Sequence, residues 1–337
     1  MWSHLWQRIA AFVQDDSGDD FESIAIGLFH RQFELNEAYR RYVKALGIEP
    51  NTLRRWQDIP AAPAAAFKDF DLTCCGVATC SKVFHSSGTT QANASKHWMD
   101  SDALRLYEVS LLRGYDLALG HEAGGLPIWA MMPRPHDAPH SSLSHMLETL
   151  GAQHWFWGDW RALAVALDAL DAPVAIFGTG FAFVALFEEF PTRCWKLPAG
   201  SVLVNTGGFK GRTREEPRGR FYGSMRDRLG VPDNACLSEY GMSEMTSQFY
   251  SAGELGQFRA PRWLRTRVID PLTGDDAAQG SAGLLRHYDL ANWNSVCAIQ
   301  TQDLGISFGE GFRLLGRAAE AHVRGCSLTV EELWNRG

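Results

Sequence analysis

Hydrophobic and polar positions follow a repeating order through the middle of the chain. Short apolar runs, which are typical of buried strands, occupy residues 127–132, 151–157, 173–178 and 202–205. Between them, apolar residues recur every three or four positions, which predicts helices over 142–150, 162–170 and 181–190. Strands that alternate with helices indicate a mainly parallel sheet covered on both faces, with the loops after the strands along one edge.

The segments on either side of this region have different patterns. Apolar residues recur at threes and fours across 21–47, which predicts a helical segment that ends near Gly47. From about Gly253, short apolar runs separated by Gly- and Asp-rich turns predict a small, mostly antiparallel β subdomain. The sequence therefore predicts an α/β protein with an N-terminal helical segment, an α/β core, a small β subdomain and a C-terminal tail, over 1–80, 81–252, 253–316 and 317–337.

Composition narrows the class of protein. Of the 337 residues, 45% are hydrophobic and 21% are charged, as in ordinary globular proteins. Lys and Arg total 32 and Asp and Glu total 39, which gives a net charge of −7 and no general attraction to nucleic acid. The sequence has no apolar run long enough to span a membrane and no signal-peptide pattern, so we expect a cytoplasmic protein.

Cysteines in such a compartment are expected to be reduced. Cys74, Cys75, Cys80 and His85 lie close together in the sequence, but they lack the C-x-x-C pairs of a zinc site. We therefore favour buried thiols over a metal centre.

A polar segment from Phe84 to Lys96 carries the first chemical signal. Its hydroxyl residues surround a glycine, in the order Ser86, Ser87, Gly88, Thr89 and Thr90. The sequence predicts a strand over 82–84 before this segment and a helix over 98–113 after it. Backbone N–H groups, hydroxyls and a lysine in such a loop can hold phosphates. The spacing is not that of a Walker A loop, and a Ser/Thr-rich surface turn is the alternative.

Two further motifs could contact a nucleotide. Gly207 and Gly208 follow the run 202–205 after one intervening threonine, and paired glycines let a flat ring approach the backbone. The segment from Tyr240 through Gly241 and Ser243 to Glu244 combines an aromatic ring, a hydroxyl and a carboxylate, which could stack a base, bind phosphate and hold Mg²⁺. The same segment also resembles a nucleophile elbow without its second glycine, which makes a hydrolase a remote alternative.

The last signals lie near the C-terminus. Asp303, in a Thr-Gln-Asp-Leu-Gly segment that we expect at a strand end, could accept both hydroxyls of a ribose, although a turn aspartate is the commoner explanation. Cys326, beside an arginine and a glycine, could be a nucleophilic thiol or simply a small buried residue. Residues 178–183 match only half of a dinucleotide fingerprint, so we interpret them as a strand-to-helix turn that lines a pocket.

The order of these motifs resembles that of the adenylate-forming superfamily, which includes acyl-CoA synthetases, adenylation domains and firefly luciferase. Within it, the chain is most similar to the LuxE-type acyl-protein synthetases. The segments that favour this family within the superfamily are 39–42, 59–60, 66–68, 206–210 and 324–328. The resemblance implies a large α/β N-terminal domain with a β-barrel-like subdomain, and a mobile C-terminal domain that is largely absent here.

The resemblance also implies roles for the motif residues. Ser86, Ser87, Thr89 and Thr90 would contact the phosphates of ATP. Tyr240 would stack on adenine, and Gly207 and Gly208 would border it. Ser243 would contact the α-phosphate, Glu244 would hold Mg²⁺, and Asp303 would hold the ribose. Gly88, Gly241 and Arg317 would also bind ATP. Lys96 or Lys210 would neutralise charge, and Cys326 would accept the acyl group as a thioester. The implied reaction activates a carboxylic acid as an acyl-adenylate, and the implied partner is an acyl reductase or another acyl acceptor.

Some questions stay open at the level of sequence. Trp129, His140, Trp155, Trp157, Phe181, Phe183 and Phe209 could line a pocket for either a fatty or an aromatic acid, and the abundance of tryptophan slightly favours an aromatic one. Gln91 and Gln302 stand where the superfamily commonly has glycine, and Lys96 lacks a preceding proline. These differences motivate the alternative of a carboxylate-binding protein that keeps the fold without turning over ATP.

Overall fold

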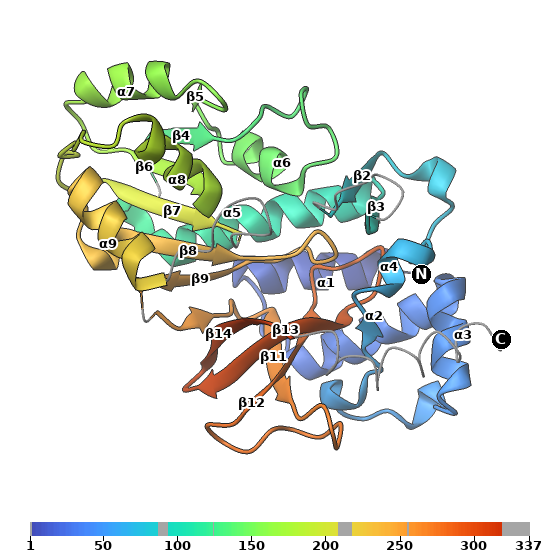
Figure 1. Ribbon diagram of the computed structural model, residues 1–337. Coiled ribbons are helices and arrows are strands. Elements are labelled where there is room, and N and C mark those ends of the chain that lie inside the picture. Colours follow the sequence, from blue (N-terminus) through green and yellow to red (C-terminus); the bar gives the residue numbers. More distant parts are fainter. Residues whose placement is uncertain (1, 87–93, 124, 208–217, 255, 319–337) are drawn as a thin grey trace. The chain divides into compact units, whose positions relative to one another are not determined.

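The parallel strands predicted from the sequence form the centre of one of two compact units in the chain (Figure 1). The computed structural model describes residues 2–86, 94–123, 125–207, 218–254 and 256–318. One unit comprises residues 1–113, 242–247 and 259–337, and the other comprises 114–241 and 248–258. We refer to them as the first and second units. The sequence-based division into four segments stays a prediction.

In the second unit, the strands are ordered β5-β4-β6-β7-β8-β9. All neighbours are parallel except β8 and β9, which are antiparallel. The strands are β4 (Ile128–Met131), β5 (His154–Trp155), β6 (Ala175–Thr179), β7 (Val202–Thr206), β8 (Cys236–Tyr240) and β9 (Phe249–Ala252). The helices are α6 (Ser142–Thr149), α7 (Trp160–Asp168), α8 (Gly180–Glu189) and α9 (Arg218–Leu229), with a short 3-10 helix η5 (Asp233–Ala235).

Alternate residues of these strands face opposite layers, as the period of two requires. Trp129, Ile176, Leu203 and Cys236 are aligned across four neighbouring strands, and all pack into the cluster formed with α7, α8 and α9. On the other face, the Phe177 ring packs 5.8 Å from that of Tyr115 in α5 (Ser101–Ala123). Because both of their faces are buried, the central strands β4, β6 and β7 are mostly apolar, which is why their sequence signal was strong. The predicted α/β fold with a mainly parallel sheet is confirmed.

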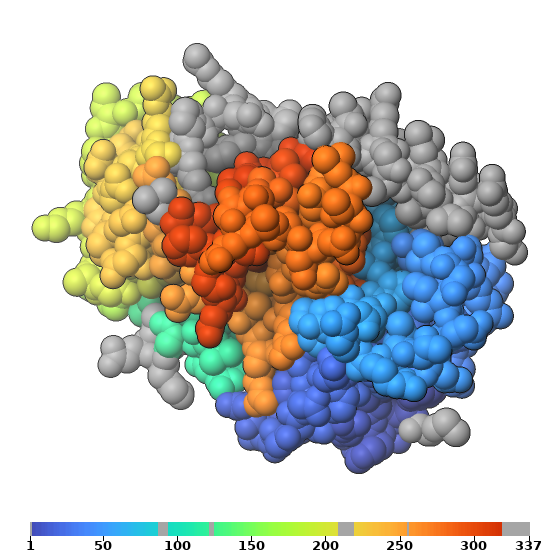
Figure 2. All heavy atoms as spheres, turned by 90° about the horizontal axis from the view of Figure 1, so that it is seen from below, coloured from blue at the N-terminus to red at the C-terminus, as the bar shows by residue number. Residues whose placement is uncertain are grey.

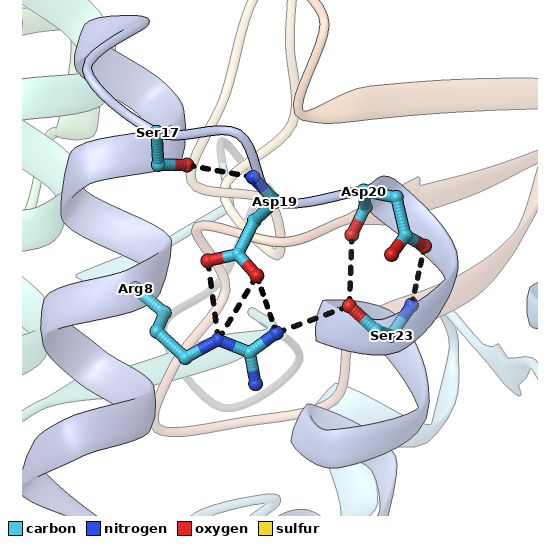
Figure 3. A network of polar contacts seen from close by, with 5 residues as sticks. All are labelled: Arg8, Ser17, Asp19, Asp20 and Ser23. Carbon is cyan, nitrogen blue, oxygen red and sulfur yellow. Dashed lines mark hydrogen bonds and ion pairs between the residues drawn. The ribbon is translucent and has the colours of Figure 1, made fainter.

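The first unit begins with three helices, α1 (Ser3–Gln14), α2 (Phe21–Leu35) and α3 (Glu37–Ala45). Figure 3 shows the polar contacts at the turn between α1 and α2, where the Arg8 guanidinium binds Asp19 at 2.7 Å and Ser23 at 3.0 Å. Asp20 caps α2 by accepting a hydrogen bond from the Ser23 N–H. Asn36 accepts from the Tyr39 N–H and so ends the predicted continuous helix and starts a new one.

Short elements connect these helices to the rest of the first unit. They are η1 (Pro50–Thr52), η2 (Trp56–Asp58), β1 (Ala62–Pro63), α4 (Ala66–Asp69), η3 (Val77–Thr79) and the antiparallel pair β2 (Lys82–His85) and β3 (Lys96–Met99). β10 (Phe258–Arg259) contains the last residue of the second unit and the first of the following segment.

An antiparallel sheet completes the first unit, in the order β11-β12-β13-β14. The strands are β11 (Leu264–Ile269), β12 (Ala282–Asp289), β13 (Ala298–Phe308) and β14 (Gly311–Arg317). Figure 2 shows the orange atoms of this region beside the blue atoms of the N-terminal segment. The contacts agree, since the ring of Tyr288 packs 4.8 Å from Trp56 and the Arg265 guanidinium lies 4.2 Å from the Phe21 ring.

Two local predictions need correction. The helix predicted over 98–113 is present but begins at Ser101, because Lys96–Met99 form β3, which pairs with Lys82–His85, and Asp100 accepts a hydrogen bond from the Ala103 N–H at the start of α5. The candidate phosphate loop therefore joins two antiparallel strands instead of a strand and a helix. Asp303 lies inside the long strand β13 and not at its end, opposite Arg317 of β14.

Within the described residues, none of the helices combines the length and the apolar character that crossing a bilayer requires.

Candidate functional site

The two ends of the candidate phosphate loop are held together by the β2–β3 pair. His85 is directly opposite Lys96. Beyond this pair, the Ser86 N–H donates to the Ser95 carbonyl at 3.1 Å, and the Ser95 N–H donates to the Ser86 hydroxyl at 2.9 Å. Ser87, Gly88, Thr89 and Thr90 lie outside the described residues, so their predicted contacts with phosphate stay predictions.

A second motif lies directly against this hairpin. The Ser243 hydroxyl donates to the His85 carbonyl at 3.1 Å, although the two residues are 158 positions apart. Nδ1 of His97, the second residue of β3, lies 2.8 Å from the Ser243 carbonyl oxygen. The structure thus brings the base of the Ser/Thr-rich loop and the Ser243–Glu244 motif together in the first unit.

Asn292 extends the same connection. Its Oδ1 lies 3.0 Å from Nε2 of His97, and its Nδ2 donates to the Glu244 carbonyl at 2.9 Å. Glu244 is 6% exposed, so its carboxylate is largely removed from bulk water. His97 and Asn292 therefore fix the backbone on both sides of the peptide bond that joins Ser243 to Glu244.

A buried aspartate anchors the end of this segment. Asp289 accepts hydrogen bonds from the N–H groups of Thr246, Ser247 and Ala291, at 2.8 to 3.0 Å, and from the Ser247 hydroxyl at 2.7 Å. Ser247 also contacts the indole N–H of Trp263 at 3.0 Å. Burial raises the pKa of Asp289, while these four donors act in the opposite direction. A carboxylate with four donors holds the segment 242–247 in one conformation.

Burial also controls the charge of His97. The side chain is fully enclosed, and this desolvation lowers its pKa to about 4, partly opposed by its contacts with Ser243 and Asn292. A neutral imidazole carries one N–H, so only the protonated ring could donate to both oxygens. The lowered pKa favours the neutral ring at pH 7, and in this form only one ring nitrogen donates a hydrogen bond, either to the Ser243 carbonyl or to Asn292 Oδ1.

In the second unit, Gly207 and Tyr240 lie at the same edge of the sheet. Thr206, at the end of β7, is opposite Glu239, the next-to-last residue of β8, so the residues that follow both strands are neighbours. Gly207 has a φ of 69°, a left-handed conformation that favours glycine. This is the carboxyl edge of parallel strands, where ligands commonly bind in open α/β sheets.

Tyr240 itself is 8% exposed. Its ring packs 5.7 Å from Phe249 and 5.7 Å from Phe258, which fixes its orientation. Gly241 follows it, and a Cβ there would lie 2.7 Å from Oε1 of Glu239. This oxygen is the end of a flexible side chain that can move aside, so the contact does not by itself require glycine at position 241.

The other predicted site residues are distributed between the two units. In the first unit, Asp303 is half-buried, its N–H bonds the Thr301 hydroxyl at 3.0 Å, and Arg317 is exposed. In the second, Trp155 and Phe181 are half-buried, His140 is exposed, and Trp157 is 46% exposed and packs against Trp160. Four more predicted residues, Gly208, Phe209, Lys210 and Cys326, lie outside the described residues. The substrate pocket stays a prediction.

Sequence reasoning missed His97, Asp289 and Asn292. For Asp289 and Asn292, a signal was present in the sequence from Asp289 to Ser295, where Asp, Asn and Ser residues are mixed with apolar ones. All of these polar residues are fully buried. Among the described residues, no group of three or more His, Cys, Asp or Glu side chains could hold a metal ion. A Mg²⁺ ion that arrives with phosphates needs only one or two protein carboxylates, so the role of Glu244 in holding Mg²⁺ stays a prediction.

Comparisons with known proteins identify the fold. No protein-family model matches the sequence, and neither does any curated protein. Two crystal structures of 2-hydroxyisobutyryl-CoA ligase match 88% of this chain. The open conformation with 2-HIB-AMP and CoA has a TM-score of 0.63 and 16% sequence identity, and the match covers 69% of that chain. The postadenylation state with R3-HIB-AMP has a TM-score of 0.65 and 17% sequence identity, and the match covers 67% of that chain. ATP-bound MatB from Rhodopseudomonas palustris has a TM-score of 0.50 at 15% identity, over 74% of this chain and 50% of that one. The chain thus shares its fold with these proteins, over about two-thirds of the length of 2-hydroxyisobutyryl-CoA ligase and half of the length of MatB.

Proposed function

We propose that this protein uses ATP to activate a carboxylic acid as an acyl-adenylate, with release of pyrophosphate. The observation that carries the proposal is the contact between two motifs that are far apart in the sequence. Ser243 bonds the backbone of His85, and His97 contacts the backbone of Ser243, so the Ser243–Glu244 motif is fixed beside the two strands that the Ser/Thr-rich loop connects.

The chemistry of these groups suits a triphosphate. Ser86 and Ser243 supply hydroxyls, Lys96 supplies a positive charge at the hairpin, and Glu244 supplies a carboxylate in a place with little access to water. Mg²⁺ bound at Glu244 would offset the negative charge of the phosphate oxygens. The surrounding hydrogen bonds hold these groups in position before the substrate arrives, which lowers the barrier by preorganisation.

The proposed reaction follows from the weakness of a carboxylate as an electrophile. A carboxylate oxygen attacks the α-phosphorus of ATP, a new phosphorus–oxygen bond forms, and pyrophosphate leaves with the bonding electron pair. The part of the protein is to align the two reactants and to stabilise charge on the leaving group. The fold of ligases whose structures contain 2-HIB-AMP and ATP supports this class of reaction.

We further propose the finer assignments made from the sequence. The chain would be a LuxE-type acyl-protein synthetase, would use Mg²⁺, would act in the cytoplasm, and would pass the acyl group to the thiol of Cys326 or to an external thiol. The acid would be fatty or aromatic, and a reductase or another acceptor protein would take the product. A protein that binds carboxylates without ATP turnover is the alternative, motivated by Gln91 and Gln302.

Carboxylate-dependent exchange between pyrophosphate and ATP tests the reaction. A screen across fatty and aromatic acids is expected to find one class that supports exchange. Glu244→Ala is expected to abolish the exchange, and Glu310→Ala is the matched control, because Glu310 is an exposed carboxylate in the same unit. Calorimetry that detects carboxylate binding but no ATP binding, with no exchange for any acid, would favour the binding protein instead.

Acyl transfer needs a separate experiment. With the active acid carrying a radiolabel, the wild-type protein is expected to retain a label that hydroxylamine releases, as a thioester would. Cys326→Ser is expected to lose this label and keep pyrophosphate exchange. If Cys326→Ser keeps the label, the acyl group is carried elsewhere.

A further inference from the structure

Two cysteines of the first unit lie in direct contact outside the candidate site. Sγ of Cys75 is 3.3 Å from Sγ of Cys80, and the two residues flank the single turn η3 (Val77–Thr79). Both side chains are half-buried, so reagents of small size can reach them. A disulfide needs the sulfurs at about 2 Å, so only a small local movement separates this dithiol from a closed bond.

The surroundings of the pair are polar and organised. Nδ2 of Asn294 lies 3.3 Å from Sγ of Cys75 and 3.9 Å from Sγ of Cys80, and it donates to the Thr73 hydroxyl at 2.9 Å. The Thr73 hydroxyl is itself 3.6 Å from Sγ of Cys75. Cys74 differs from both, because it is buried and its thiol faces the carbonyl of Ser295.

We propose that Cys75 and Cys80 form a thiol–disulfide exchange site whose reaction partner is the disulfide of a small thiol. Cys75 is the attacking thiol and Cys80 the resolving one. The proposal rests on the contact between the sulfurs, on the donors around Cys75 and on the partial exposure of both residues. It does not depend on the proposed function.

The two thiols are not equivalent. Partial burial opposes ionisation of Cys75, but hydrogen bonds from Thr79, Thr73, Asn294 and Cys80 outweigh it, and its pKa is lowered. Partial burial and the adjacent Cys75 sulfur raise the pKa of Cys80 to about 12. Negative charge shared by the pair therefore resides on Cys75, which agrees with its role as the attacking group.

The exchange is balanced in atoms and electrons. The Cys75 thiolate attacks one sulfur of the small disulfide, a mixed disulfide forms, and one small thiolate leaves. Cys80 then loses its proton to solvent and attacks Sγ of Cys75, which forms the Cys75–Cys80 bond and releases the second small thiolate. The protein is oxidised by two electrons, and the small disulfide is reduced by two.

Peptide mapping of the full chain tests the product. The protein is incubated with oxidised glutathione, quenched in acid and alkylated. Trypsin leaves all three cysteines of the segment in the peptide 69–82. We expect this peptide to lose two hydrogen atoms, with Cys74 alkylated and with no backbone fragments between Cys75 and Cys80. A disulfide that includes Cys74, or none at all while glutathione remains on other residues, would overturn the assignment.

Single substitutions test the roles. Cys80→Ser is expected to accumulate a stable mixed disulfide at Cys75, and Cys75→Ser is expected to react at Cys80 roughly tenfold more slowly. Cys194, an exposed thiol in the second unit, is the internal control. The rate of glutathionylation is compared between Cys80 in the Cys75→Ser variant and Cys75 in the Cys80→Ser variant. Equal rates would contradict the proposed order of attack.

A second probe does not require oxidation. A trivalent organic arsenical binds two adjacent thiols much more tightly than one, and we expect it to protect Cys75 and Cys80 together from alkylation. Protection is expected to be lost in either single variant, while Cys74→Ser is expected to keep it. Equal binding to wild type and Cys75→Ser would show that the two thiols do not act as a pair.

Discussion

Nδ1 of His97 lies 2.8 Å from the carbonyl oxygen of Ser243, although 146 positions separate the two residues in the chain. His97 belongs to the strand that closes the Ser/Thr-rich loop, and Ser243 precedes the carboxylate predicted to hold Mg²⁺. Since the imidazole is fully buried and also contacts Asn292 at 3.0 Å, it fixes one motif relative to the other. The geometry of the proposed phosphate site therefore depends on a residue that need not touch a phosphate.

Replacement of His97 by alanine is expected to destabilise the protein and to weaken ATP binding. The change leaves a cavity and removes the partner of the Ser243 carbonyl, which together cost about 2–4 kcal/mol of the free energy of unfolding. Urea unfolding measures the loss, and calorimetry at low temperature measures ATP affinity in the folded fraction. His97→Asn, whose amide N–H can take the place of Nδ1, is expected to recover part of both quantities. His4→Ala is the control, because His4 is exposed. If His97→Ala is as stable as His4→Ala, the contact between His97 and Ser243 does not contribute to stability.

Acid is expected to destabilise the first unit through two buried histidines. Burial lowers the pKa of His97 to about 4 and that of His287 to about 3, whereas an unfolded histidine titrates near 6.5. The unfolded chain therefore binds protons first, so stability is complete above about pH 6.5 and falls as the pH drops toward 4 and then 3. For His97 the loss is on the order of 3 kcal/mol. Urea unfolding between pH 7 and pH 5 measures how steeply the free energy of unfolding changes with pH. The His97→Asn variant is expected to show a smaller change than the wild type. An equal change in both proteins would mean that His97 is already protonated in the folded state.

The contact between α1 and α2 is expected to have a modest effect on stability. Arg8 makes paired hydrogen bonds to Asp19 and a further one to Ser23, and the hydrogen bond from Arg8 is the main cause of the lowered pKa of Asp19. Arg8→Ala is expected to cost about 1 kcal/mol, measured by urea unfolding, because the pair is only partly shielded from water. Arg55→Ala, which breaks a more exposed pair with Asp58, is the control and is expected to change little. Equal effects of the two variants would show that the Arg8 network adds nothing beyond a surface ion pair.

The central strands could be predicted from the local sequence because both of their faces are buried among apolar side chains. Ile128, Ile176 and Val204 lie in strands with both faces buried, so their apolar runs are visible without knowledge of any partner. The strand Lys96–Met99 was missed because only four residues form it, and its strand character comes from pairing with Lys82–His85. The helix Arg218–Leu229 was missed because charged residues interrupt its apolar spacing.

The chemical motifs were visible for a similar reason, since Ser243 and Glu244 belong to a compact local pattern. The residues that support them were not visible. Asn292 and His97 are polar residues that would suit a surface, and only contacts with segments 48 and 195 positions away make them buried parts of the scaffold. Sequence reasoning thus found the groups suited to chemistry and missed those that hold them in place.

Asp289 gives the sharpest test of that support. Asp289→Ala would leave three buried backbone N–H groups and the Ser247 hydroxyl without their acceptor, which is expected to cost about 3–5 kcal/mol of the free energy of unfolding. The control is Asp275→Ala, because Asp275 is an exposed aspartate of the same unit. Urea unfolding compares the two variants. Because Asp289 anchors residues 242–247, ATP affinity and pyrophosphate exchange are expected to fall in Asp289→Ala even at a temperature where circular dichroism shows it folded. If its stability and exchange rate match those of Asp275→Ala, the segment that carries Glu244 is held by other contacts, and the supporting role assigned to Asp289 is wrong.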